Sequence, residues 1–356
     1  MKIAFILNGP STVPIGGHKV VYEYANAMAQ KGHKVTIYFD CEGGRNIYGI
    51  PPIVMYFRRW IIGKYKIKWF SLEKQISLCP CREINQQNVG KNDIIVTTAV
   101  VPAKKAYENL SKKNKIINLV QGYETWCLPE KDLQWIFKQG KKNIVVAQWL
   151  KEKMQEDARE KTIYIPNGID LNFWRVKNSI EKRDAKSIAM LYSVLETKGS
   201  QYGILALEKV KQKYSELHVT FFGTTPRSDN IPEWVHYVEN ASPEQVFEIY
   251  NNAAIYLNPS LGEGFGLTNI ESMACGCALI TTNYDAVKDY AVHESNAIVT
   301  EIKNVEQMVN ALEYLIEKNI QRIEIAQAGN EMVNKRFQWE QSFQEFEKVL
   351  KEEIET

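Results

Sequence analysis

Short runs of β-branched and apolar residues alternate with stretches of helical periodicity along most of the chain, and this alternation restricts the fold more than any other feature. The expected strands cover residues 3–7, 34–38, 93–97, 115–120, 143–147, 162–165, 187–191, 218–222, 255–257 and 278–282. The expected helices between them lie near residues 101–109, 149–158, 200–214, 242–251 and 267–275. Such alternation predicts parallel sheets with helices on both faces, which is an α/β fold.

The length of the chain predicts two domains. One hydrophobic core rarely grows beyond about 250–300 residues, and this chain has 356. The turn at residues 166–168 separates the two alternating halves, and the polar stretch 177–186 suits a surface connection after it, so we place the boundary near residue 170. A final helix carries an apolar face that must pack against another element. That face consists of Trp339, Phe343, Phe346 and Leu350.

A first glycine loop, Gly16-Gly17, precedes the opening helix. In open α/β sheets, ligands bind beyond the carboxyl ends of the strands, where glycines let phosphate or sugar approach the backbone. A flexible turn explains this pair equally well. The dinucleotide fingerprint Gly-x-Gly-x-x-Gly is absent, which counts against a dehydrogenase.

A second loop, at residues 258–271, is more informative because it joins a strand to a helix that begins near Leu267. Unpaired amides and the positive end of the helix dipole would attract an anion there. Glu263 and Glu271 can both accept hydrogen bonds from vicinal hydroxyls such as those of a sugar. The alternative for Glu271 is a carboxylate that complements the helix dipole. The backbone can bend at Gly262, Gly264 and Gly266.

The segment from Glu263 to Gly276, with a glutamate, seven residues and a second glutamate, resembles the signature of glycosyltransferase family 4. The resemblance extends to Gly16-Gly17, Gly32-His33, Asn167 to Asp170, Lys198-Gly199, Gly223 and Pro259-Ser260. It implies the GT-B architecture: two Rossmann-like doubly wound parallel-sheet domains facing a cleft, with a C-terminal helix packing back toward the N-terminal domain. The implied parts are an acceptor-binding domain at 1–168, a nucleotide-sugar-binding domain at 169–337 and the crossing helix at 338–356.

The resemblance also implies roles for individual residues. Glu271 would hold the ribose hydroxyls of the donor nucleotide, and Glu263 would contact the transferred sugar. Lys198 would neutralise the donor diphosphate, with a solvated surface lysine as the alternative. The candidate catalytic residues are Glu263, Lys198 and Gln121. The remaining expected donor contacts are Gly16, Gly17, Gly223, Gly264, Phe265, Gly266 and Leu267.

The chain departs from the family pattern at two places. Where the family has a Gly-Arg pair five residues before the lysine, this chain has Tyr192-Ser193, so a second cation for the diphosphate is missing. Where many relatives have a histidine, this chain reads Gln121 to Glu124, which is similar to a rhamnosyltransferase-like subgroup. Loop polarity explains these residues equally well. The candidate sugar or acceptor contacts in this domain are His18, Tyr123 and Glu124.

The resemblance implies a retaining, metal-independent hexosyltransferase. The expected reaction moves a hexose or deoxyhexose from a UDP- or dTDP-linked donor to a glycan or lipid-linked acceptor in cell-surface polysaccharide or glycoconjugate biosynthesis. The leaving diphosphate would be stabilised by helix amides and Lys198. The alternatives are a nucleotide-sugar epimerase of the same architecture and a non-catalytic nucleotide-sugar-binding regulator. The glutamate pair favours transfer over epimerisation.

No metal or other cofactor is expected, because the chain has no Asp-x-Asp motif and its histidines lack metal-type spacing. Two Cys-x-Cys pairs offer zinc thiolates in principle, but structural thiols in a reduced compartment explain them better. The cysteines are Cys41, Cys79, Cys81, Cys127, Cys275 and Cys277. A formal charge of +2 gives no reason to expect nucleic-acid binding.

The stretch 55–70 combines basic and aromatic residues and has no acidic residue. Such a stretch can lie on an anionic membrane, and a twisted strand pair with a solvated basic face is the alternative. Its basic residues are Arg58, Arg59, Lys64, Lys66 and Lys68. Because no membrane span or signal peptide is recognisable, we expect a cytoplasmic protein, with peripheral contact at the inner face of the plasma membrane as a hypothesis.

Overall fold

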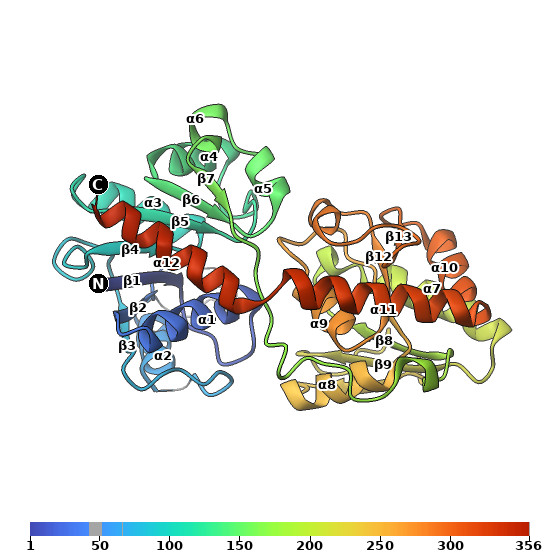
Figure 1. The fold of residues 1–356 in the computed structure, drawn as a ribbon. Helices are drawn as coiled ribbons and strands as arrows, with labels where there is room; N and C mark the ends of the chain where they lie inside the picture. Colours follow the sequence, from blue (N-terminus) through green and yellow to red (C-terminus); the bar gives the residue numbers. More distant parts are fainter. Residues whose placement is uncertain (43–51, 66, 356) are drawn as a thin grey trace. The chain divides into compact units, whose positions relative to one another are not determined.

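The computed structural model describes residues 1–42, 52–65 and 67–355, and the chain divides into two compact units (Figure 1). Unit 1 comprises Met1–Pro166 and Glu340–Thr356, and unit 2 comprises Asn167–Trp339. The final stretch of the chain therefore belongs to the same unit as its beginning. Lys66, one of the basic residues of the stretch 55–70, lies outside the described residues.

Unit 1 is built on a parallel sheet of seven strands within the described ranges, in the order β3-β2-β1-β4-β5-β6-β7. Its strands are β1 Lys2–Asn8, β2 Lys34–Asp40, β3 Ser77–Cys81, β4 Ile94–Thr97, β5 Ile116–Val120, β6 Lys142–Val145 and β7 Thr162–Tyr164. Its helices are α1 Gly16–Gln30, α2 Pro52–Tyr65, α3 Val100–Asn109, α4 Glu130–Gln139, α5 Gln148–Glu152, α6 Glu156–Arg159 and α12 Trp339–Glu355. Residues 94–97 and 116–120 are buried throughout, as expected for central parallel strands covered on both faces.

Unit 2, all of whose residues are described, contains a six-stranded parallel sheet in the order β10-β9-β8-β11-β12-β13. Its strands are β8 Ser187–Leu191, β9 His218–Gly223, β10 His236–Glu239, β11 Ile255–Asn258, β12 Ala278–Thr282 and β13 Ile298–Thr300. Its helices are α7 Ser200–Lys213, α8 Pro243–Asn252, α9 Leu267–Ala274, α10 Val305–Glu317 and α11 Asn319–Arg336, with 3-10 turns η1 Ile180–Lys182, η2 Glu196–Lys198 and η3 Asp285–Asp289. The predicted pair of doubly wound α/β units is confirmed.

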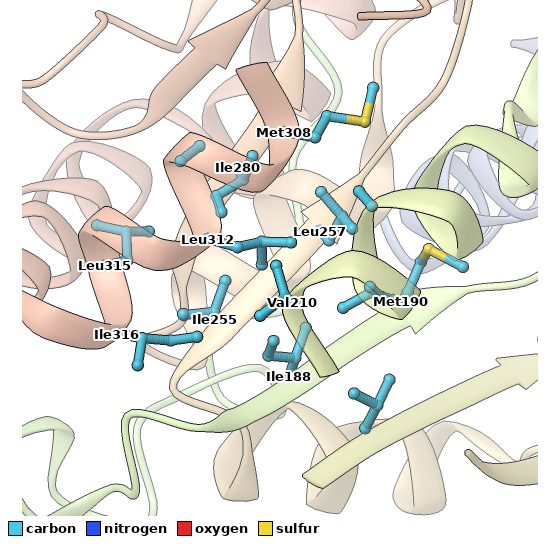
Figure 2. Close-up of a cluster of buried hydrophobic side chains, with 14 of the residues drawn as sticks. Ile188, Met190, Val210, Ile255, Leu257, Ile280, Met308, Leu312, Leu315 and Ile316 are labelled. Carbon is cyan, nitrogen blue, oxygen red and sulfur yellow. The ribbon is translucent and has the colours of Figure 1, made fainter. Parts of the chain in front are cut away.

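One face of the unit 2 sheet is covered by an apolar core (Figure 2). Strands β8, β11 and β12 contribute alternate side chains to it, and helices α7 and α10 supply the opposing layer. The labelled members are Ile188, Met190, Val210, Ile255, Leu257, Ile280, Met308, Leu312, Leu315 and Ile316. Because these strands run parallel, their carboxyl ends, and the loops that follow them, lie at a common edge of the sheet.

The C-terminal helix α12 packs on unit 1, as the apolar face of that helix predicts. The ring of Phe346 lies 6.1 Å from that of Phe5 in β1 and 4.3 Å from that of Tyr24 in α1, measured between centroids. Phe343 lies against the same Tyr24 ring at 5.6 Å. These contacts join residues far apart in sequence, so the helix contributes to the core of unit 1.

Two lysines and a histidine of unit 1 hold Glu347 of α12. Its carboxylate lies 2.6 Å from Lys351 Nζ, 2.9 Å from His33 Nε2 and 3.2 Å from Lys31 Nζ. The hydrogen bond from Lys351 is the main cause that lowers the pKa of Glu347 to about 2 from its ordinary value of 4.5, with His33 and Lys31 adding to the effect.

We expect Glu347→Gln to lower the free energy of unfolding at pH 7 by about 1 kcal/mol, because the partners lose a charged acceptor. The folded-state pKa is depressed, so this stabilisation is complete above pH 4.5 and disappears as the pH falls toward 2. Urea unfolding at pH 7 and pH 3 measures it. Glu345→Gln, at an exposed position of the same helix, should change neither value.

Two sequence expectations are wrong. Within the stretch 55–70, residues up to Tyr65 belong to helix α2, so the alternative of a strand pair is excluded for this part. Aromatic and β-branched residues favour strands locally. Here the segment forms a helix, one side of which packs on β3. The single helix expected at 149–158 is divided into α5 and α6. At the break, the Gln155 N–H donates to Gln134 Oε1 instead of continuing the helix.

Candidate functional site

The order of strands in unit 2 reverses between β8 and β11, which are paired neighbours. From β8 the chain continues outward to β9 and β10, whereas from β11 it continues the other way to β12 and β13. Loops that leave adjacent strands at such a point diverge and leave a crevice, where open α/β sheets bind ligands. The loop after β8 carries Lys198, and the loop after β11 carries Glu263.

The two loops are in direct contact. The Leu261 N–H donates to the Thr197 carbonyl at 2.7 Å. Gly199, between η2 and α7, has a φ of +61°, and a Cβ at this position would lie 2.0 Å from the Pro259 carbonyl oxygen. Only glycine combines this left-handed backbone with so close an approach. The Lys198-Gly199 pair therefore positions one loop against the other.

Lys198 and Glu263, two of the predicted catalytic residues, form an ion pair. Lys198 Nζ lies 3.1 Å from Glu263 Oε2, and the exposed fractions of the two side chains are 27% and 10%. The other carboxylate oxygen, Oε1, accepts from Ser260 Oγ at 2.7 Å and from Asn258 Nδ2 at 3.3 Å. The carboxylate is thus held by three groups, and its orientation is set before any ligand binds.

A buried polar network lies beneath the glycine loop and was not predicted from the sequence. Asn269, fully buried in α9, accepts from Asn258 Nδ2 at 2.6 Å. Its amide donates to the hydroxyls of Tyr284 and Tyr290, each at 2.9 Å, and these hydroxyls lie 2.9 Å apart. Burial raises the pKa of both tyrosines, so they stay protonated. The only sequence signal was a pair of asparagines, Asn258 and Asn269, at buried positions flanking the loop.

The residue that precedes helix α9, Gly266, must be a glycine because of the network. Gly266 has a φ of +95°, and a Cβ there would lie 2.4 Å from the Tyr290 hydroxyl and 2.7 Å from that of Tyr284. No acidic residue occupies the first turn of α9, so its amino-terminal end keeps its positive potential. Glu271 lies in the second turn, as predicted, and is 6% exposed. This arrangement suits an anion at the helix start with a carboxylate nearby.

The position of the missing arginine is occupied by an uncharged residue. The Ser193 N–H donates to Ser200 Oγ at 3.0 Å. Beyond Gly223, at the end of β9, Arg227 donates to the carbonyls of Ile231, Pro232 and Val235 at 2.7–3.3 Å. The guanidinium of Arg227 therefore stabilises the loop to which it belongs.

In unit 1, Gln121 contacts the Gly16-Gly17 pair, which we expected before the opening helix and which the structure places in the first turn of α1. Gln121 Nε2 donates to the Gly17 carbonyl at 3.1 Å, so the strand end after β5 is joined to the start of α1, which begins at Gly16. His18 Nε2 lies 3.2 Å from the Gly9 carbonyl, and burial lowers the pKa of His18. The structure therefore brings Gln121 and the Gly16-Gly17 pair together.

The other predicted sugar or acceptor contacts have local partners. Glu124 Oε2 accepts from the Val100 N–H at 2.9 Å at the start of α3, and burial raises the pKa of this carboxyl group. The Tyr123 hydroxyl donates to Glu130 Oε1 at 3.0 Å, and burial raises the pKa of Tyr123 to about 12. Glu124 also lines a small pocket with Gln121 at the ends of β4 and β5. Their role toward a sugar stays a prediction.

No group of three or more His, Cys, Asp or Glu residues within ranges 1–42, 52–65 and 67–355 is arranged to hold a metal ion. One Cys-x-Cys pair lies in β3 and the other follows α9. Burial raises the pKa of Cys81 and Cys277 to about 12, which keeps them as thiols. Among the same described residues, no helix is both long and apolar enough to cross a bilayer.

We expect Gly199→Ala to lower the free energy of unfolding by about 2–3 kcal/mol, because it combines a left-handed backbone with a backbone clash at Pro259. Chemical denaturation monitored by tryptophan fluorescence measures the change. Gly262→Ala is the matched control, since a Cβ there would meet nothing within 4 Å. Equal stability of the two variants would show that the two loops are not held in contact.

Comparison with known proteins adds independent findings. Two family models match the chain, Glycosyltransferase Family 4 over residues 15–173 and Glycosyl transferases group 1 over residues 172–332. An uncharacterized glycosyltransferase of Haemophilus influenzae is 23% identical over 326 residues, covering 85% of this chain and 86% of the relative. The capsular polysaccharide biosynthesis glycosyltransferase CapM of Staphylococcus aureus is 23% identical over 235 residues, covering 59% of this chain and 62% of the relative. The structure of Anabaena HepE in complex with UDP-glucose is similar in fold, with a TM-score of 0.74, 14% identity, and 99% of this chain and 100% of that chain covered.

Proposed function

The chain belongs to glycosyltransferase family 4 and has the GT-B fold, and we propose that it transfers a hexose or deoxyhexose from a nucleoside-diphosphate sugar with retention of configuration. The observation that carries the proposal is the ion pair between Lys198 and Glu263 at the strand-order reversal of unit 2. A cation and an oriented carboxylate beside the start of α9 suit a diphosphate attached to a hydroxyl-rich ring.

Binding of the donor follows from these groups. The ammonium of Lys198 and the first amides of α9 would neutralise the diphosphate, since both carry positive charge and need no metal ion. Glu263, already oriented by Ser260 and Asn258, would accept hydrogen bonds from hydroxyls of the transferred sugar. Glu271 would accept them from the ribose. Residues 264–267 and Gly223 would contribute backbone contacts to the donor.

The proposed reaction needs no protein nucleophile. The bond from the anomeric carbon to the diphosphate oxygen breaks, and the acceptor hydroxyl oxygen bonds to the anomeric carbon on the same face. The acceptor proton passes to an oxygen of the leaving diphosphate. Negative charge grows on the diphosphate in the transition state, so a fixed cation and helix amides there would accelerate the step.

The finer features of the proposal are the donor base, the acceptor and the location. The UDP-glucose bound by HepE supports a uridine donor, with a thymidine donor as the second candidate. The name of CapM supports a role in polysaccharide biosynthesis, for which we propose a glycan or lipid-linked acceptor. The proposed acceptor site lies in residues 1–168, with His18, Tyr123 and Glu124 as its contacts beside the catalytic candidate Gln121. The proposed location of the enzyme is the cytoplasm, at the inner membrane face. We propose no metal ion and no nucleic-acid partner.

A nucleotide-release assay tests the function. UDP- and dTDP-linked hexoses and deoxyhexoses are incubated with the enzyme, with and without a glycan and lipid extract as acceptor. A transferase releases nucleoside diphosphate in an acceptor-dependent way, and EDTA leaves the rate unchanged. An epimerase instead interconverts donor sugars without acceptor dependence, and a regulator binds donor without releasing nucleotide. Either of these last two results would overturn the proposal.

A further inference from the structure

The order of strands in unit 1 also reverses, between the paired neighbours β1 and β4 (Figure 1). From β1 the chain continues to β2 and β3, whereas from β4 it continues the other way to β5, β6 and β7. Ligands of open α/β sheets bind beyond the carboxyl ends of the strands at such a reversal. The loop after β5 reaches this place, because Gln121 donates to the Gly17 carbonyl of α1, the helix that follows β1. The fold therefore suits a ligand at this edge of unit 1 as well.

The pocket at the ends of β4 and β5 offers hydrogen-bonding groups to such a ligand. Gln121 and Glu124 both line it. Oε2 of Glu124 accepts from the Val100 N–H, and a carboxylate can accept further hydrogen bonds through its other oxygen. The amide oxygen of Gln121 is an acceptor as well. These groups suit the hydroxyls of a ligand.

Trp126 lies beside this pocket, in the loop after β5, and its side chain is 64% exposed. Gly122 lines the pocket, and a Cβ at Gly122 would lie 3.6 Å from Cη2 of Trp126. The indole ring therefore lies against the backbone of its own loop. Single exposed apolar side chains are common on protein surfaces. Trp126 differs from such a side chain because it stands where the sheet suits a ligand and next to polar groups that could bind one.

The loop that carries Trp126 is held by its own hydrogen bonds. The Cys127 N–H donates to the Glu124 carbonyl at 2.9 Å, and the Thr125 N–H donates to the Tyr123 carbonyl at 2.8 Å. A tryptophan on a held backbone offers a large contact surface and loses little conformational freedom when a ligand binds. The loop is therefore suited to present the indole ring to a partner.

We propose that Trp126 is the platform on which a pyranose ring of the acceptor stacks, while Gln121 and Glu124 bind hydroxyls of that ring. This inference rests on the proposed transferase function and narrows its acceptor to one that ends in a sugar. A pyranose has an apolar face of C–H groups, which can pack on an indole face, and a rim of hydroxyls. A hydrocarbon chain is a poorer occupant, because it would cover the polar groups of Gln121 and Glu124 without replacing their hydrogen bonds to water.

Acceptor kinetics test the platform. Methyl pyranosides of glucose, galactose, N-acetylglucosamine and rhamnose serve as acceptors, with the donor that the nucleotide-release assay identifies. We expect Trp126→Ala to raise the acceptor KM by about tenfold or more, with kcat and the donor KM within about twofold of wild type. Trp126→Tyr keeps an aromatic face and should recover part of the loss. A tryptophan with a purely structural role would not affect the acceptor KM alone.

Trp135→Ala is the matched control. Trp135 lies in α4 of the same unit and is 39% exposed, so its substitution also removes an exposed indole. All kinetic constants should stay within about twofold of wild type. The unfolding midpoint of Trp126→Ala should equal that of wild type, because the side chain removed is largely exposed.

Saturation-transfer NMR with the full chain measures binding of the same pyranosides without turnover. In wild type, saturation should pass to the C–H protons on one face of the pyranose ring. The transfer should be lost in Trp126→Ala and retained in Trp135→Ala.

Three outcomes would overturn the inference. They are equal acceptor KM and equal saturation transfer for wild type and Trp126→Ala, no saturation transfer to any pyranoside in wild type, and transfer to a polyprenyl phosphate without a sugar but to none of the pyranosides. Calorimetric titration of UDP and dTDP should give the same affinity for wild type and Trp126→Ala. Absence of nucleotide binding in wild type would contradict the transferase function itself, so the failure of each proposal is recognised separately.

Discussion

Replacing Lys198 by alanine is expected to lower kcat/KM for sugar transfer by roughly two to three orders of magnitude. The ammonium group is the cation that the structure places beside Glu263, in the loop that precedes α9, and it would act where the leaving diphosphate gains charge. A group that acts mainly in the transition state affects kcat more than KM. Steady-state kinetics of nucleotide release with varied donor concentration measures both constants.

Lys186→Ala is the matched control, because Lys186 forms an ion pair with Glu216 at 2.8 Å at a partly exposed position of the same unit. It should leave kcat/KM within about twofold of wild type, as expected for a surface substitution. Lys198→Arg should recover part of the activity, since it keeps the charge but changes its geometry. Wild-type kinetics for Lys198→Ala would show that the lysine is only a solvated side chain.

Replacing Glu271 by alanine is expected to weaken nucleoside-diphosphate binding by roughly a hundredfold. A carboxylate that accepts two ribose hydroxyls contributes two hydrogen bonds to a charged group, each with a net contribution of about 1.5–3 kcal/mol. Two bonds at the lower end of this range correspond to roughly a hundredfold in affinity. Calorimetric titration of UDP and dTDP into the variant and wild type measures the difference. In contrast to Lys198→Ala, the loss should be the same for nucleotide and nucleotide sugar, since the ribose is common to both.

Because Glu271 is 6% exposed, alanine also leaves a space inside α9 that can destabilise unit 2. Glu271→Gln keeps the shape and loses the charge, so it separates the two effects: binding should still weaken, while the unfolding midpoint stays close to that of wild type. Glu244→Ala, in the first turn of α8, removes an exposed carboxylate of the same unit and should leave the affinity unchanged. Unchanged UDP affinity in Glu271→Gln and Glu271→Ala would show that Glu271 does not contact the ribose.

Helix α2 shows where sequence patterns are ambiguous. Its residues include aromatic and β-branched side chains that are common in strands, and the charged residues do not follow a simple period. Only the structure identifies the buried side of this helix, because it shows that Gly63 lies against β2 and β3. Strand β3 was not predicted either: it contains Pro80, which is tolerated because β3 lies at the edge of the sheet.

The glycine loop shows how much of a site can be predicted. Glu263, Glu271 and Lys198 were identified because their spacing and their place at strand ends are local properties of the sequence. The partners that orient Glu263, Ser260 and Asn258, were not predicted, although they are near it in sequence. The network beneath them is completed by Asn269, Tyr284 and Tyr290. The sequence around a buried tyrosine does not indicate which amide group will form a hydrogen bond with its hydroxyl.

The sequence by itself determined the α/β class, the two doubly wound units and the candidate donor residues, because hydrophobic periodicity, glycines and helix starts are read over a few neighbouring positions. Only the tertiary structure decided three features. Lys198 forms an ion pair with Glu263, Glu124 accepts a hydrogen bond from the Val100 N–H at the start of α3, and the side chain of Phe57 in α2 is exposed. The physical reason is common to all three. Ion pairs, buried hydrogen bonds and exposed faces depend on which elements pack together, and packing joins residues that are distant along the chain.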